Sequence, residues 1–126
     1  MIFSIRMGLP EMDKFWTDLC SREESGKLDK SELKVFKRLL KALHLLSMNP
    51  RHPGLASHEI DSLSRIAGFK VWQSYVENNT PAAGRIFWAY APRKCEITIL
   101  GFEPHPEDKK KSGYLKVKLS KLPPLD

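Results

Sequence analysis

The segments Arg85-Ile-Phe-Trp-Ala-Tyr90 and Cys95-Glu-Ile-Thr-Ile-Leu-Gly-Phe102 decide the fold of this chain of 126 residues. Both are rich in aromatic and β-branched residues, which favour strands. The four residues between them, Ala91-Pro92-Arg93-Lys94, predict a short turn. We therefore expect two antiparallel strands joined by this turn.

The neighbouring segments extend this hairpin into a sheet. Phe69-Lys-Val-Trp-Gln-Ser-Tyr-Val76 predicts a preceding strand, so three strands form an antiparallel meander. Residues 1–10 begin with a short strand, and Tyr114 to Leu119 alternates as an edge strand would. After the turn-rich connector of residues 49–54 the helical periodicity is lost. Residues 58–119 are therefore predicted to form an antiparallel sheet with a C-terminal tail.

Residues 11–48 predict a pair of helices. In the first, apolar residues recur at i, i+3, i+4 and i+7, the spacing of one helical face, at Met12, Phe15, Trp16 and Leu19. The second begins with Asp29 and Glu32, which have the spacing of a capping box. It ends at Asn49-Pro50, because proline disfavours helical geometry in the residue before it. The chain is thus expected to be one α+β domain, residues 1–126, with two N-terminal helices on an antiparallel sheet.

The composition limits where the protein works. No apolar run approaches the length of a membrane span, and the first residues lack the pattern of a secretory signal. The two cysteines, Cys20 and Cys95, have no metal-ligand spacing, and we expect reduced thiols in a cytoplasmic protein without cofactor or metal.

The positive charge is concentrated in the second half of the chain. The net charge is +6; residues 1–63 contribute +1 and residues 64–126 contribute +5. The excess of cations therefore lies in the part that predicts the sheet. A basic sheet surface suits a polyanion such as RNA, because it neutralises phosphates and releases their counterions.

The order of these elements resembles the RelE/ParE superfamily of toxins from toxin–antitoxin systems. The resemblance depends on Asn49-Pro50 after the second helix, Pro53-Gly54-Leu55, Arg85-Ile-Phe-Trp-Ala-Tyr90, and a histidine followed by a tyrosine near the C-terminus. It spans most of the chain, from about Ile2 to Leu119. It implies two N-terminal helices on a curved antiparallel sheet.

The resemblance also implies a function. Many members are mRNA endonucleases that act on the ribosome and are silenced by a cognate antitoxin protein. By position, Arg85 matches the strand arginine that holds the scissile phosphate. His105 falls near the late histidine or arginine that serves as acid or charge stabiliser, and Tyr114 matches the C-terminal tyrosine of the site.

Other residues suit RNA binding or proton transfer. Cleavage through the 2′-OH needs a base, an acid and a cation for the phosphorane charge, and no metal. His52 and His58 flank the connector before the sheet, a region from which some relatives supply the general base. Lys109, Lys110 and Lys111 beside Tyr114 combine phosphate attraction with an aromatic platform, and Lys70 is a further cation near a predicted strand.

Two other functions remain open. The loop before Arg85 and the segment from His105 to Tyr114 are longer than in the superfamily pattern. These departures suit a non-enzymatic relative that inhibits a protein target such as DNA gyrase. The basic charge alone also suits a nucleic-acid-binding module of the same fold.

Overall fold

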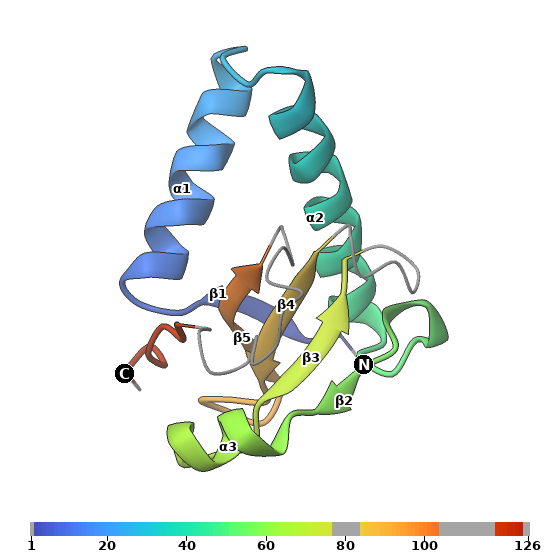
Figure 1. Cartoon of the computed structure of the whole chain (residues 1–126), viewed down its shortest axis with the longest axis vertical. Helices are drawn as coiled ribbons and strands as arrows, with labels where there is room; N and C mark the ends of the chain where they lie inside the picture. Colours follow the sequence, from blue (N-terminus) through green and yellow to red (C-terminus); the bar gives the residue numbers. More distant parts are fainter. Residues whose placement is uncertain (1, 77–83, 104–117, 125–126) are drawn as a thin grey trace.

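A mixed sheet forms the centre of the molecule, and five of its strands lie within the residues that the structure describes (Figure 1). The computed structural model describes residues 2–76, 84–103 and 118–124. The strand order is β1-β5-β4-β3-β2. The strands are β1 (Ser4–Met7), β2 (His58–Glu59), β3 (Trp72–Tyr75), β4 (Arg85–Ala89) and β5 (Glu96–Glu103). The helices are α1 (Glu11–Glu24), α2 (Lys30–Met48) and α3 (Asp61–Ala67), with a 3₁₀ turn η1 (Pro53–Leu55).

The predicted meander is confirmed, because β3, β4 and β5 pair antiparallel in chain order. The expectation of a purely antiparallel sheet is wrong, since β1 pairs parallel with β5. Parallel neighbours need a long crossover between them. Here both helices of the hairpin, η1, α3 and three strands lie between β1 and β5 in the chain.

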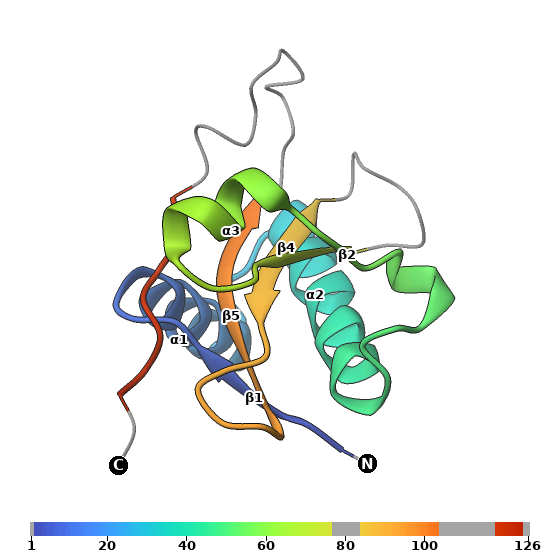
Figure 2. The ribbon, with the colours of Figure 1, turned by 90° about the horizontal axis from the view of Figure 1, so that it is seen from below.

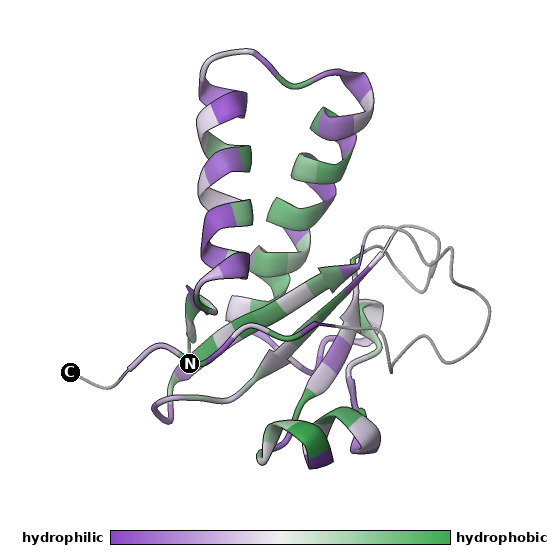
Figure 3. Cartoon of the chain, turned by 60° about the vertical axis from the view of Figure 1, so that its left-hand side comes forward, coloured by the Kyte–Doolittle hydropathy of each residue, from purple (hydrophilic) through white to green (hydrophobic). Residues whose placement is uncertain are grey.

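Both N-terminal helices are confirmed and form a hairpin on one face of the sheet. Asp29 caps α2 through the predicted box: its side chain accepts from the Glu32 amide at 2.8 Å, and Glu32 accepts from the Asp29 amide at 3.0 Å. Figure 3 shows that the sides of α1 and α2 that face each other are mostly apolar, whereas their outer sides are polar. The apolar sides of the two helices are therefore buried between the helices and the sheet, and the polar sides face solvent.

The third helix was not predicted. α3 follows β2 directly and lies on the sheet face opposite α1 and α2 (Figure 2). It has only seven residues, of which Leu63 is buried and Ile66 is 70% exposed, so it lacks an apolar stripe that periodicity could detect. Its clearest signal is Gly68, whose positive φ of 85° ends the helix in the left-handed conformation that glycine adopts readily.

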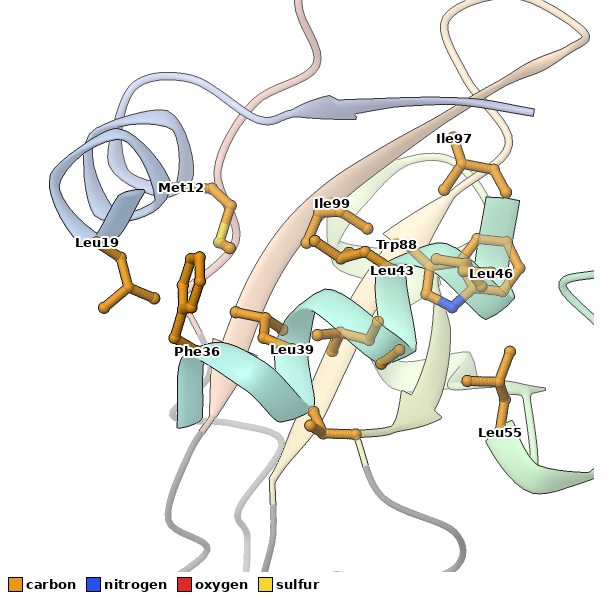
Figure 4. Packing of buried hydrophobic residues seen from close by; sticks show 13 residues of the cluster. Met12, Leu19, Phe36, Leu39, Leu43, Leu46, Leu55, Trp88, Ile97 and Ile99 are labelled. Atoms are coloured by element: carbon orange, nitrogen blue, oxygen red, sulfur yellow. The ribbon is translucent and has the colours of Figure 1, made fainter. Parts of the chain in front are cut away.

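The core is divided by the sheet into two parts. Between the hairpin and the sheet, Leu39, Leu43 and Leu46 of α2 point toward Trp88 of β4 and the isoleucines of β5 (Figure 4). On the other face, Ile60, Leu63 and Val71 pack against the strands, at Phe87, Ala89 and Leu100. Phe87 and Trp88 are fully buried and belong to the core on opposite faces of the sheet.

Trp88 is fixed by polar and aromatic contacts as well as by burial. Its indole N–H donates to the Ser74 hydroxyl at 2.8 Å, and its ring stacks on Trp72 with 5.7 Å between ring centroids. Trp72 and Trp88 are register partners, so β3 and β4 are joined on this face by side chains as well as by the backbone.

None of the helices in the described ranges has the length and apolar content that crossing a bilayer requires. In the same ranges, no group of three or more His, Cys, Asp or Glu residues is arranged to hold a metal ion.

Candidate functional site on the outer sheet face

The site is built on the sheet face opposite the hairpin, which we call the outer face and define by His58, Gln73, Tyr75, Arg85, Phe87 and Glu103. Register partners in a sheet project to the same side. One row across the strands therefore contains His58 of β2, Gln73 of β3 and Phe87 of β4. The next row contains Tyr75, Arg85 and Glu103.

α3 covers only part of the outer face. Its core contacts are with Phe87, Ala89 and Leu100. β4 begins at Arg85, at the end away from α3, and runs toward that helix (Figure 1). The row of Tyr75, Arg85 and Glu103 therefore lies at the end of the sheet away from α3, and all three residues are half-buried.

Arg85 is directed toward the row that contains His58. Its guanidinium carbon lies 5.5 Å from the centroid of the Phe87 ring, a cation–π contact along β4. Phe87 is two strands from His58, a separation of about 10 Å at normal strand spacing. The guanidinium and the imidazole thus lie on one face of the sheet.

The carboxylate of Glu103 belongs to the same row as Arg85. Register partners on antiparallel strands have Cα atoms about 4.5–5.5 Å apart, and Arg85 and Glu103 are such partners. An acid at this distance reduces the electrostatic cost of a half-buried guanidinium. The carboxylate also suits the role of holding the Arg85 guanidinium in the orientation in which two of its N–H groups bind one phosphate.

The hydrogen bond of His58 leaves one ring nitrogen able to accept a proton, as a general base requires. Its Nδ1 lies 3.0 Å from the Ala56 carbonyl oxygen, which only accepts, so Nδ1 carries the proton. In the neutral ring Nε2 then has a lone pair and is able to accept a proton. The side chain is exposed, so Nε2 is accessible to a substrate.

His52, the other candidate base, has the opposite arrangement. Its Nδ1 accepts a hydrogen bond from the Gly54 amide at 3.0 Å and caps the η1 turn. In the neutral ring Nε2 therefore carries the proton and is a donor. The two histidines that the sequence treats alike thus differ in which nitrogen can take up a proton.

The other predicted site residues lie apart from Arg85 or outside the described residues. Lys70 is exposed and precedes β3, whereas Tyr75, the register partner of Arg85, ends that strand. Five residues of extended chain separate Lys70 from Tyr75, a distance on the order of 16 Å. The residues outside the described ranges are His105, Lys109, Lys110, Lys111 and Tyr114.

The two cysteines do not belong to this face, and neither forms a disulfide. Cys20 is in α1, where burial and the neighbouring carboxylates of Glu23 and Glu24 raise its pKa above the ordinary value. Cys95 is exposed, in the turn before β5.

This difference predicts selective alkylation. Because the thiolate is the reactive form, iodoacetamide at pH 8 should modify Cys95 faster than Cys20. Peptide mass spectrometry over a time course measures both rates. Equal rates would contradict the raised pKa of Cys20.

Comparison of the chain with protein-family models, curated proteins and solved structures finds no match.

Proposed function

We propose that the chain is the toxin of a type II toxin–antitoxin system, of the RelE/ParE kind, and that it cleaves translated mRNA without a metal ion. The observation that carries this proposal is the position of the Arg85 guanidinium over Phe87, in the row that begins with His58. A cation and a proton acceptor on one face of the sheet are two of the three groups that RNA cleavage through the 2′-OH needs.

The base in this mechanism is His58. Its Nε2 takes the proton of the ribose 2′-OH as the 2′-oxygen attacks the neighbouring phosphorus. The hydrogen bond from Nδ1 to the Ala56 carbonyl fixes the tautomer and stabilises the imidazolium that forms. His52 is not assigned this role, because its Nδ1 lone pair accepts from the Gly54 amide.

Arg85 stabilises the charge that develops on the phosphate. Its two-point fork binds two non-bridging oxygens of the phosphorane, and its contact with Phe87 limits its rotation. The O2′–P bond forms and the P–O5′ bond breaks, which gives a 2′,3′-cyclic phosphate and a 5′-OH. Because the attacking group is the 2′-OH, DNA is not a substrate.

The remaining roles follow from the superfamily resemblance. His105 donates the proton to the leaving 5′-oxygen, and Tyr114 completes the site. His105 follows Glu103 by two positions in the chain, and Glu103 is the register partner of Arg85. Lys109, Lys110 and Lys111 attract the RNA backbone. The partners are mRNA on the ribosome and an antitoxin whose acidic segment covers the outer face and Arg85.

Replacing His58 with alanine tests this assignment. We expect mRNA cleavage on translating ribosomes to slow by about 10²–10⁴-fold, the contribution of a positioned general base. The matched control is His44→Ala, which removes an exposed histidine from α2, on the hairpin side of the sheet. Primer extension measures the cleavage rate.

The outcomes separate the alternatives. Slow cleavage by His58→Ala with normal cleavage by His44→Ala supports His58 as the base. Equal cleavage by both variants would reject that role. Growth arrest by the wild type without any cut transcript would instead support inhibition of a protein target.

A further inference from the structure

A pocket with basic side chains lies beside the outer face, at the edge of β3. It is a pocket of about 380 Å³ between α2, η1 and the end of β3. We call it the α2 pocket and define it by Arg38, Lys41, His52, Leu55, Tyr75 and Val76, which are among the residues that line it. Its volume is within the range of small-ligand sites.

The pocket exists because β2 is short. Among the described residues β2 pairs only with Trp72 and Gln73, so no strand covers the edge of β3 at Ser74 and Tyr75. η1 packs there instead, and the hydroxyls of Ser57 and Ser74 bond at 2.6 Å at this edge. Tyr75, which lines the pocket, is the register partner of Arg85. The α2 pocket thus adjoins the row that contains Arg85.

The polar groups of the pocket suit an anion. Arg38 and Lys41 are three residues apart on α2, so their side chains lie on neighbouring parts of one helix face. His52 adds a donor, because the Gly54 amide occupies its Nδ1 and leaves the proton on Nε2. No acidic side chain lines the pocket in the part of the chain that the structure describes.

The remaining surface of the pocket is apolar or aromatic. Leu55 and Val76 are buried and belong to the main core, so they give the pocket a rigid apolar wall. The phenol ring of Tyr75 supplies a surface on which a base can stack. Cations, an apolar wall and an aromatic ring together match a nucleotide better than a free inorganic anion.

We propose that the α2 pocket binds the nucleotide next to the cleaved one, with its phosphate on Arg38, Lys41 and His52 and its base against Tyr75. The proposal rests on the function proposed above, because it places this nucleotide on the same RNA strand as the phosphate held by Arg85. It adds a binding subsite to the cleavage site and assigns His52 to phosphate binding.

Salt-dependent binding of an RNA that resists cleavage tests the subsite. The probe is a fluorescein-labelled single-stranded 2′-O-methyl oligonucleotide, which lacks the attacking hydroxyl. Each phosphate contact to a single strand contributes about 0.7 to the slope of log Kobs against log salt. We expect Arg38→Ala/Lys41→Ala to reduce the slope by about 0.7, because one phosphate contact is lost, and to weaken binding at least about tenfold; Lys41→Ala alone should reduce the slope by less.

The matched control is Lys34→Ala. It removes the same charge from the same exposed side of α2, about 10 Å from Lys41 along the helix axis, and Lys34 does not line the pocket. Its slope should equal that of the wild type. Circular dichroism of each variant checks the fold. If the double variant unfolds, the slope of Lys41→Ala still tests the pocket, because Lys41 is exposed and its loss should not affect folding. In the wild type, the amide signals of Gly54 and Tyr75 should shift when the oligonucleotide is added.

Two results would overturn the α2 pocket as a nucleotide site. One is equal slopes for the wild type, Lys41→Ala and the double variant. The other is unchanged RNA binding with weaker binding of a poly-glutamate peptide, which would make the pocket a site for an acidic protein segment. Neither result affects cleavage through His58 and Arg85. Failure of the wild type to cut mRNA would reject the proposed function, and the salt slopes would still show whether the α2 pocket binds a nucleotide.

Discussion

Replacing Arg85 with alanine should reduce the rate of mRNA cleavage by about 10²–10³-fold, the usual effect of removing one group that stabilises transition-state charge. The loss should appear in kcat, because the guanidinium binds the phosphorane more strongly than the ground-state phosphate. Cleavage of a reporter mRNA on translating ribosomes, measured at saturating protein, gives this rate directly.

Two controls make this result specific. Arg65→Ala removes an exposed arginine of α3, whose ion pair with Asp61 is also exposed, and should leave cleavage unchanged. Arg85→Lys keeps the charge but loses the two-point fork and should recover only part of the activity. Cleavage by Arg85→Ala at the wild-type rate would reject Arg85 as the phosphate ligand.

Replacing Trp88 with alanine is expected to lower the free energy of unfolding by about 3–5 kcal/mol. Trp88 is fully buried between the hairpin and the sheet, and it contacts Leu46 and the rings of Trp72 and Tyr90. The substitution leaves a cavity and removes the donor to the Ser74 hydroxyl. Urea unfolding followed by circular dichroism measures the change.

Trp88→Phe separates the two causes. It keeps most of the buried ring but loses the indole N–H, and should cost less than alanine. Leu40→Ala on α2, where the side chain is 44% exposed, should change stability by less than about 1 kcal/mol. A similar small effect for Trp88→Ala would contradict the packing of α2 on β4.

The elements that local patterns specify could be predicted from the sequence. The apolar stripe from Met12 to Leu19 and the box of Asp29 and Glu32 predicted α1 and the start of α2. The strands around Arg85 and Ile97 were found because aromatic and β-branched residues are concentrated there. In each case the signal lies within a few residues of the chain.

The elements that depend on tertiary contacts could not be predicted. The parallel pairing of β1 with β5 joins residues about ninety positions apart, and nothing near Ser4 encodes its direction. β2 has only two residues. α3 has one buried residue, Leu63, and so no periodic apolar stripe that could be recognised in the sequence. Such short elements are stabilised by their neighbours.

In the candidate site, too, the residues with a local signal could be predicted and the contacts made by folding could not. The sequence singled out Arg85 and placed it at the start of a strand, but its contact with Phe87 depends on the outer face. It could not rank His52 against His58, because the difference lies in backbone partners two residues away, the Gly54 amide and the Ala56 carbonyl. The α2 pocket was not predicted either, since α2, η1 and β3 meet only in the folded chain.

The most direct test of RNA cleavage at the outer face is the chemistry of the cut end. Wild-type protein, incubated with translating ribosomes, should produce mRNA fragments that end in a 2′,3′-cyclic phosphate. A single 2′-deoxynucleotide at the cleaved position should abolish the cut, and so should Arg85→Ala. Intact mRNA with the wild type, or cutting that continues at the deoxynucleotide, would contradict a nuclease that works through the 2′-OH.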